Sequence, residues 1–183
     1  MEQIKELTKK LISNSFKELM LEFSFEKITI KMITDHANVI RPTFYNHFHD
    51  KYELVEWILK DEITEPVRDL VLQGKLEDGI SFIFKKFYED REYYRKAFEI
   101  TGQNGFTETV TGVFTELFMD LLSKVNWKGD DTFMTAEVVC RYYTSGLISM
   151  IHMEIDDADH MSVDKYISTY KYLMQHTVYE FLK

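Results

Sequence analysis

A chain of 183 residues, 45% hydrophobic and 29% charged, is long enough for one or two folded domains and too apolar for a disordered protein. Only seven glycines and two prolines leave little room for the tight turns of an all-β fold. A single cysteine excludes an intrachain disulfide, and neither a membrane span nor an apolar signal segment is evident. We therefore expect an all-α protein of the cytoplasm.

The charge is divided unevenly along the chain. The net charge is −9, yet residues 1–60 hold nine basic and nine acidic side chains, so the whole excess lies in residues 61–183. An acidic surface repels DNA, because DNA-binding proteins neutralise phosphates with Lys and Arg. Any contact with nucleic acid is therefore expected in residues 1–60. The asymmetry also predicts two domains with separate tasks, divided between residues 60 and 61.

Apolar residues recur every three or four positions from Ile4 to Phe23, which is the period of a helix with one buried face. The following segment breaks this pattern and is expected to be a loop. A short second helix then begins, with Thr29 as its N-cap. Asn38 occupies the turn after that helix, since Asn tolerates the positive φ that such a turn needs. The next short helix carries Pro42 in its first turn, where the missing N–H is not needed.

The helical pattern continues downstream. Phe44 and Phe48, four residues apart, are predicted to share one face of the third helix. Asp50 and Glu53 are spaced as a capping box for a fourth helix, which Pro66 should end or kink. Further helical patterns cover residues 76–101, 105–126, 131–154 and 162–182. The chain thus predicts about nine helices and no sheet.

Two short helices joined by a turn of three or four residues, the second with a polar face, describe a helix-turn-helix that binds DNA. Such spacing alone is common among helical proteins. The residues are more specific, because the sequence over about residues 8–58 resembles the DNA-binding domain of the TetR family of bacterial transcriptional regulators. The resemblance lies in residues 29–39, in Thr43-Phe-Tyr-Asn-His-Phe48 and in Asp50-Lys-Tyr-Glu-Leu54.

The resemblance implies roles for individual side chains. Thr43 and Tyr45 match residues of a recognition helix that touch phosphates and base edges, and His47 and Lys51 match phosphate contacts. Arg41 lies where bases are contacted, and a guanidinium suits guanine in the major groove. The other candidates are a helix cap and two further residues of the recognition helix: Thr29, Pro42 and Asn46. Plainer interpretations stay open, with Tyr45 and His47 as hydrated surface residues and Arg41 paired with a neighbouring acid.

The resemblance also implies how the remaining residues act. Residues 61–183 match a helical body that dimerises and binds a small-molecule effector. The protein is then expected to bind a pseudo-palindromic double-stranded operator as a homodimer, most simply as a repressor. No catalytic residue, metal or cofactor is implied, and no acid–base constellation suggests an enzyme. The alternative is an interaction protein or co-activator that keeps this fold but acts through a protein partner.

Residues 61–183 are rich in aromatic side chains at helical spacing, which favours plain core over a ligand site for any one of them. Together they could line an apolar pocket with tyrosine hydroxyls as polar handles. The candidates for effector contact are Phe98, Gln103, Asn104, Phe118, Arg141 and Tyr142. Gln103 and Asn104 lie in a polar break, for which a plain loop is the simpler interpretation. Arg141 stands in an apolar run and is expected to extend to solvent.

The last two long helices carry apolar stripes that suit a bundle shared by two subunits. The segment Gly146–Ile151 and the helix after it resemble the C-terminal part of regulators near dihydroxyacetone kinase operons. Cys140 is expected to be an inert core thiol. Acidic and histidine side chains gather before the last helix: His152, Glu154, Asp156, Asp157, Asp159 and His160. Their spacing fits no EF-hand, so a solvated acidic loop is expected.

Overall fold

The computed structural model describes residues 2–102, 104–124, 134–157 and 161–182, and every regular element within these ranges is helical. The α-helices are α1 (Glu2–Glu22), α2 (Ile30–His36), α3 (Arg41–Tyr45), α4 (Lys51–Leu59), α5 (Glu65–Leu72), α6 (Leu76–Glu89), α7 (Arg91–Phe98), α8 (Phe106–Ser123), α9 (Ala136–Asp156) and α10 (Val163–Gln175). Because α4 runs into α5 without a break, the described ranges contain nine continuous helices, and the predicted all-α class is confirmed.

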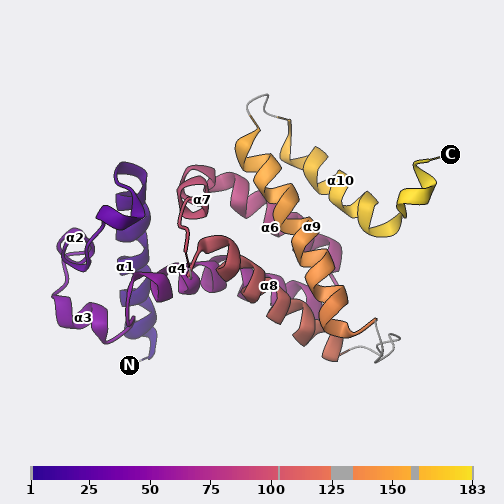
Figure 1. Ribbon diagram of the computed structural model, residues 1–183. Coiled ribbons are helices and arrows are strands. Elements are labelled where there is room, and N and C mark those ends of the chain that lie inside the picture. The colour runs from indigo at the N-terminus through magenta and orange to yellow at the C-terminus, as the bar shows by residue number, and fades with distance from the viewer. Residues whose placement is uncertain (1, 103, 125–133, 158–160, 183) are drawn as a thin grey trace.

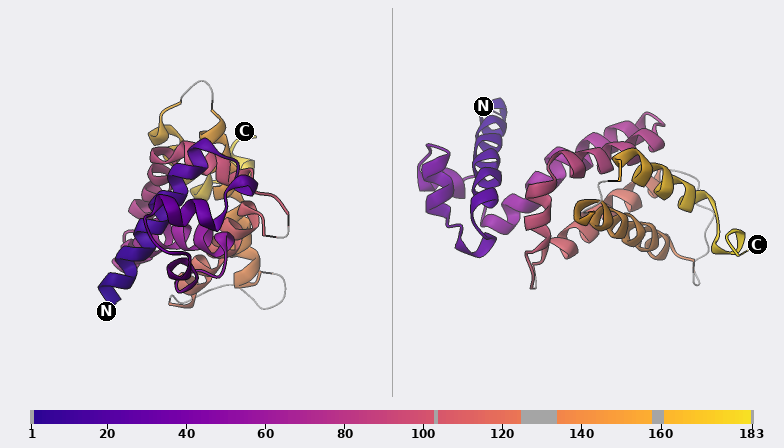
Figure 2. Two further views of the ribbon diagram at one scale, coloured as in Figure 1. Left: turned by 90° about the vertical axis from the view of Figure 1, so that its left-hand side faces the viewer. Right: turned by 90° about the horizontal axis from the view of Figure 1, so that it is seen from above.

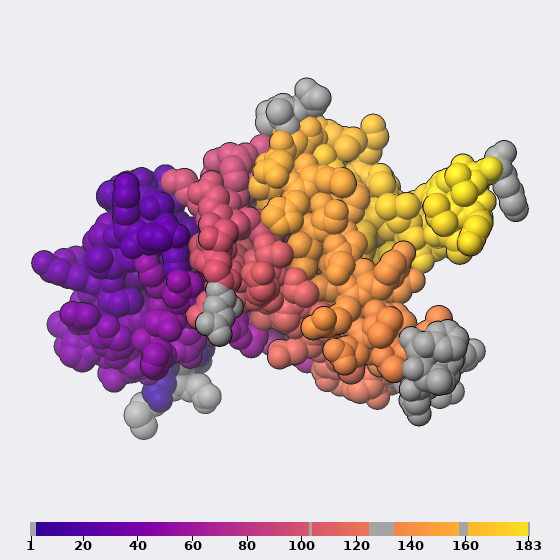
Figure 3. Space-filling model, in the orientation of Figure 1, coloured from indigo at the N-terminus to yellow at the C-terminus, as the bar shows by residue number. Residues whose placement is uncertain are grey.

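The helices form an elongated molecule with the two chain ends at opposite extremities (Figure 1). Helices α1 to α4 make an N-terminal lobe at one end, and the remaining helices make the body (Figures 2 and 3). Within the body α8 and α9 lie side by side, and α10 packs across α6 and α9. The predicted boundary at residues 60 and 61 falls inside the continuous helix from α4 to α5, and it stays a prediction.

Helix α1 buries only its second half. Phe16 and Met20 are fully buried, whereas Ile4 and Leu7 are 69% and 70% exposed. The expectation of one buried face from Ile4 onward is therefore wrong for the first turns. The sequence period is helical there, but none of the helices in the described ranges buries these apolar side chains, because α1 extends past the rest of the lobe (Figure 1).

The turn between α2 and α3 confirms the predicted local signals. The Met32 N–H donates to Thr29 Oγ1 over 3.2 Å, so Thr29 caps α2. Asn38 has a φ of 53°, the left-handed conformation that the turn requires. The Asn38 and Val39 N–H groups donate to carbonyls of the last turn of α2, which completes a Schellman motif. Residues 37–40 thereby set the angle between the two helices.

Two features of the helix from α4 to α5 differ from the sequence expectations. Asp50 Oδ1 accepts from the Tyr52 and Glu53 N–H groups, but the Glu53 carboxylate accepts from His49 N–H, one residue before the cap. Pro66 does not end the helix. The chain instead forms a wide π-helical turn at Lys60–Thr64, in which the Glu65 N–H donates to the Lys60 carbonyl, and Pro66 stands in the first turn of α5, where its missing N–H is not needed.

The body contains two more breaks than predicted, and one of them divides the pattern over residues 162–182, because α10 ends at Gln175 and a separate 3₁₀ turn follows at Val178–Glu180. The helical pattern over residues 76–101 divides at Asp90 into α6 and α7. Most of the aromatic side chains of the body form core, as expected, and the fully buried ones are Phe84, Phe87, Tyr94, Phe106 and Phe114. The buried apolar side chains form one continuous cluster from Ile12 of α1 to Tyr170 of α10. The helices that the structure describes include none with the length and apolarity needed to cross a membrane.

The cap of α4 gives a first test. Asp50→Ala removes the acceptor of two backbone N–H groups, so we expect the free energy of unfolding to fall by about 1–2 kcal/mol in urea denaturation. Asp50→Asn keeps an acceptor and should lose less. The exposed Asp35 of α2 provides the control, and Asp35→Ala should change stability by less than about 0.5 kcal/mol. Equal losses in both alanine variants would contradict the capping role.

Candidate nucleic-acid interface

Helix α3 and the turn after it each bury one phenylalanine, so the prediction that both lie on the third helix is wrong for Phe48, because α3 ends at Tyr45. Phe44 and Phe48 are buried, and their ring centroids lie 5.7 Å apart. Phe48 also contacts Trp57 of α4 at 5.7 Å, so the base of α3 is fixed to the helix behind it. With these two side chains inward, the opposite face of α3 points away from the protein. The side chains exposed on that face are Arg41, Pro42, Tyr45 and Asn46.

Arg41 and Tyr45 form a pair on the outer face of α3. The Arg41 Nη2 atom donates to Tyr45 Oη over 3.2 Å, and the guanidinium carbon lies 5.7 Å from the ring centroid. The four-residue spacing places the two side chains on adjacent turns. This pairing with a tyrosine replaces the acid partner that one sequence interpretation required. The Arg41 guanidinium has N–H donors left for a base edge or a phosphate after it has bonded to Tyr45.

The other residues of the predicted interface surround this pair. Thr29 is exposed at the start of α2, while Thr43 and His47 are partly buried. Burial lowers the pKa of the His47 imidazole, and the ammonium groups of Lys9 and Lys5 lower it further against the opposing charge of Glu6. A neutral imidazole is therefore favoured near pH 7, where it acts as a hydrogen-bond donor rather than a cation.

Lys51 is directed into the protein. Its Nζ donates to the carbonyls of Phe25 and Ile28, the latter over 3.0 Å, and lies 4.1 Å from the Phe25 ring centroid. Burial lowers the pKa of the ammonium, although the carboxylate of Glu26 opposes this. Lys51 therefore ties the start of α4 to the turn before α2, and the phosphate contact inferred from the resemblance would use its one remaining donor.

The six candidates for effector contact do not converge on one pocket. Phe98 packs in the interior against Phe106 and the ring of His152, at centroid distances of 4.9 and 3.9 Å. Asn104 is exposed and shares a surface hollow with residues at the start of α4. Arg141 extends to solvent, as expected, and pairs with Glu137 at 3.5 Å. Gln103 lies outside the described residues.

The remaining two candidates line an apolar groove on the outer side of the body. Phe118 and Tyr142 border this groove between α8 and α9, whose volume is about 740 Å³. A second groove of about 540 Å³ between α9 and α10 adjoins it and shares Tyr142, Tyr143 and Met174. We call the two grooves together the α9–α10 face. Its exposed side chains include Tyr142, which has 73% of its surface accessible and whose ring meets that of Tyr143 edge-on at 5.3 Å.

Two family models match this chain. Residues 17–58 match the bacterial regulatory proteins of the tetR family, and residues 74–178 match the C-terminal region of transcriptional regulators of the same type. The second match alone covers more than half of the chain. This chain belongs to the TetR family. As a member of a family of transcription factors, this TetR regulator acts on transcription and is not an enzyme.

Individual relatives are more distant. The curated dhaKLM operon transcriptional activator DhaS of Lactococcus lactis is 23% identical over 151 residues, which are 81% of this chain and 80% of DhaS. The solved structure of the dihydroxyacetone kinase operon activator DhaS has a TM-score of 0.69 and covers 92% of this chain and 94% of its own. NalD, a repressor from Pseudomonas aeruginosa, is 18% identical with a TM-score of 0.64, over 93% and 95% of the two chains. At these identities the structural likeness shows a shared fold.

The structure of this TetR regulator buries an acid for which the sequence predicts a solvated loop. Glu154 lies in the last turn of α9 and is 4% exposed, and neither of its carboxylate oxygens has a hydrogen-bond partner among the described residues. Burial raises the pKa of the carboxyl to about 8, although the charge of Arg91 opposes the shift. Within the described ranges no acidic and histidine side chains are grouped as metal ligands, and Asp159 and His160 lie outside those ranges.

The Glu154 carboxyl should make the stability of this TetR regulator depend on pH. The folded protein keeps its proton up to about pH 8, whereas the unfolded chain loses it near pH 4.5. Stability should therefore fall as pH rises between these values, by at most about 1.4 kcal/mol per pH unit, and level off above them. Glu154→Gln should remove this dependence in denaturant melts from pH 5.5 to 8.5. Glu137→Gln, an exposed substitution on the same helix, should leave it intact.

Proposed function

We propose that this TetR regulator is a ligand-responsive repressor that binds a pseudo-palindromic operator in the cytoplasm as a homodimer. The observation that carries the DNA contact is the Arg41–Tyr45 pair on the outer face of α3, above the buried Phe44 and Phe48. The pair is held in place before any ligand arrives, so little side-chain entropy is lost when it contacts a base edge. Thr29, Thr43 and His47 then contact the flanking phosphates, with Pro42, Asn46 and Lys51 around them.

The α9–α10 face supports the homodimer. Val138 and Tyr142 of α9 and Leu173 of α10 are each about half exposed or more, on helices whose other faces are buried in the core. A monomeric protein rarely exposes contiguous apolar grooves of this size, because water makes them unfavourable. A second copy that places its own α9 and α10 on this face would cover both grooves symmetrically. Two-fold symmetry then presents two α3 helices to one side of a duplex.

Buried polar atoms of the body support a small-molecule effector. The Tyr93, Tyr94 and Thr144 hydroxyls and the Glu154 carboxylate are buried without hydrogen-bond partners within the described ranges. Such atoms are costly in a packed interior unless water or a ligand pairs with them. These groups lie on α7 and α9, and their hydroxyl and carboxyl atoms favour an effector with several hydrogen-bonding groups. The structure of FadR from Thermus thermophilus, a TetR-family repressor, contains lauroyl-CoA.

The direction of regulation rests on the relatives and stays a prediction. DhaS is an activator, whereas NalD and FadR are repressors, and all three share the fold of this chain. A repressor requires that operator and effector weaken each other's binding to the same extent. A co-activator that works through a protein partner would instead bind that partner with the α9–α10 face or with the exposed face of α3. Direct measurement of DNA binding separates these possibilities.

Selection of bound fragments from genomic DNA, with and without added metabolites, tests the DNA contact. The protein should enrich a pseudo-palindrome, and Tyr45→Ala or Arg41→Ala should weaken binding to it about 10- to 100-fold. Tyr88→Ala, which removes an exposed tyrosine of α6, should bind as the wild type does. Regulation that persists after both α3 substitutions would favour the protein-partner alternative.

The dimer has its own test in solution. Tyr142→Asp places a carboxylate in the centre of the α9–α10 face, where a second subunit would have to desolvate it. We expect the wild type to sediment as a dimer at micromolar concentration and Tyr142→Asp as a monomer. Tyr88→Asp introduces the same change on α6, outside this face, and should remain dimeric. A dimer that survives Tyr142→Asp would place the subunit interface elsewhere.

A further inference from the structure

Four charged side chains form a closed ring where the N-terminal lobe meets the body. Lys17 Nζ lies 2.8 Å from Glu62 Oε2 and 2.9 Å from Asp90 Oδ2. Lys86 Nζ lies 3.4 Å from the same Glu62 oxygen and 2.7 Å from the same Asp90 oxygen. Positive and negative charges therefore alternate around the ring, and each side chain has two neighbours of opposite sign. All four side chains are partly buried, so solvent screens them less than surface pairs.

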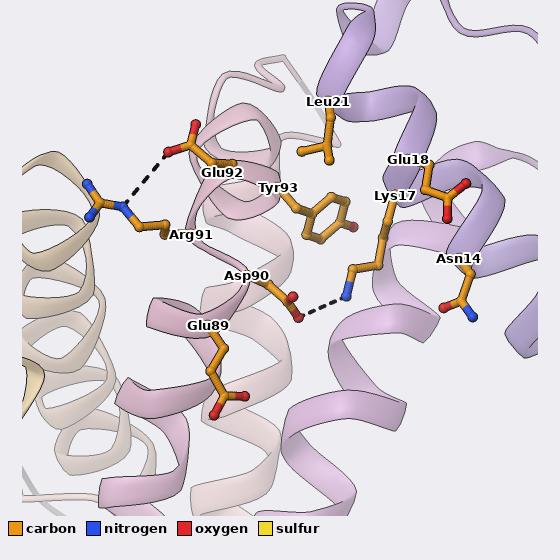
Figure 4. Close-up of a pocket in the computed structure, with 9 residues that line it drawn as sticks. All are labelled: Asn14, Lys17, Glu18, Leu21, Glu89, Asp90, Arg91, Glu92 and Tyr93. Carbon is orange, nitrogen blue, oxygen red and sulfur yellow. Dashed lines mark hydrogen bonds and ion pairs between the residues drawn. The ribbon is translucent and has the colours of Figure 1, made fainter.

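The ring joins elements that are far apart in the sequence. Lys17 comes from α1 of the lobe, Glu62 from the π-helical turn, and Lys86 and Asp90 from the corner between α6 and α7. Figure 4 shows Lys17 reaching from α1 to Asp90 beside the ring of Tyr93. Lys17 Nζ also lies 5.2 Å from the centroid of that buried ring. The ring thus attaches the lobe to the body at the π-helical turn between α4 and α5.

The ring supplies directional contacts at a junction where apolar side chains also pack, and Lys96 Nζ of α7 adds a single bond there to the Leu21 carbonyl of α1 over 2.7 Å. Around it, Phe16 of α1 packs against Tyr93 of α7, and such contacts tolerate small rotations because they have no preferred direction. Charge-assisted hydrogen bonds are directional, and Lys17 makes them to two different elements of the connection. Two bonds from one ammonium to separate anchors fix both the position of α1 and its angle to the body.

We propose that this four-charge ring is a positioning device for DNA binding, which fixes the angle between lobe and body and thereby the half-site spacing that a dimer accepts. The inference rests on the proposed dimeric operator binding. A change of one base pair moves two half-sites apart by about 3.4 Å and turns one against the other. A lobe with a fixed angle accepts one spacing, whereas a lobe free to rotate accepts several. Lys17, Glu62, Lys86 and Asp90 are positioning residues and do not touch DNA.

The test measures spacing preference separately from affinity and stability. Full-length protein is bound to duplexes that carry two copies of the selected half-site with spacers of different length. The wild type should prefer one spacer over those one base pair longer or shorter by about tenfold, and Lys86→Met should reduce this preference below about threefold. The preferred sequence of each half-site should not change. Lys85→Met, the neighbouring exposed lysine outside the ring, is the matched control and should keep the wild-type preference.

Two further variants make the outcome independent of any one substitution. Glu62→Gln keeps the side-chain shape and removes a charge, and Lys17→Arg keeps the charge. The first should relax the spacing preference and the second should retain it. A folded Lys86→Met or Glu62→Gln dimer with an unchanged preference would overturn the positioning role. A wild type that binds no duplex would instead overturn the proposed function.

Discussion

Phe16 holds the two parts of the molecule together through one side chain. Its ring meets Phe25 of the N-terminal lobe edge-on at 6.2 Å and Tyr93 of the body edge-on at 6.5 Å. The second half of α1 is therefore core for both parts at once, and the buried apolar cluster runs through it without a gap. Together with the continuous helix from α4 to α5, α1 positions the helix-turn-helix relative to the body, because it is packed in both parts. The charged ring around Lys17 acts on a junction that this packing has already brought together.

Local signals predicted the N-terminal lobe well, because short-range physics determines most of it. The Thr29 cap, the positive φ of Asn38, Pro42 in a first turn and the inward Phe44 and Phe48 all depend on a few neighbouring residues. The incorrect predictions concern the burial of side chains, which depends on tertiary contacts. The period of α1 is helical from Ile4, but whether a helical face is buried depends on a neighbouring helix that periodicity does not reveal.

In the candidate site too, local sequence predicts some features, whereas tertiary contacts determine the others. The exposed face of α3 follows from the burial of its opposite face, so Arg41 and Tyr45 could be predicted as surface residues. The direction of Lys51 into the Phe25 turn depends on a contact between residues 26 apart, which no local pattern carries. The burial of Glu154 was missed for a related reason, since the sequence pattern of α9 does not show that the helix places this acid against the core. Effector contacts were the least predictable, because helical spacing does not distinguish an aromatic core from a pocket.

The π-helical turn at Lys60–Thr64 affects how this chain can be compared with its relatives. Such a turn contains one residue more than the α-helical path between the same ends. A relative that has a regular helix here would be one residue shorter, since each residue of an α-helix turns the chain by about 100°. Alignment without a gap would then assign every later side chain to the wrong face of α5. A comparison of this chain with such a relative should therefore place a single-residue insertion between α4 and α5 before any residue of the body is compared.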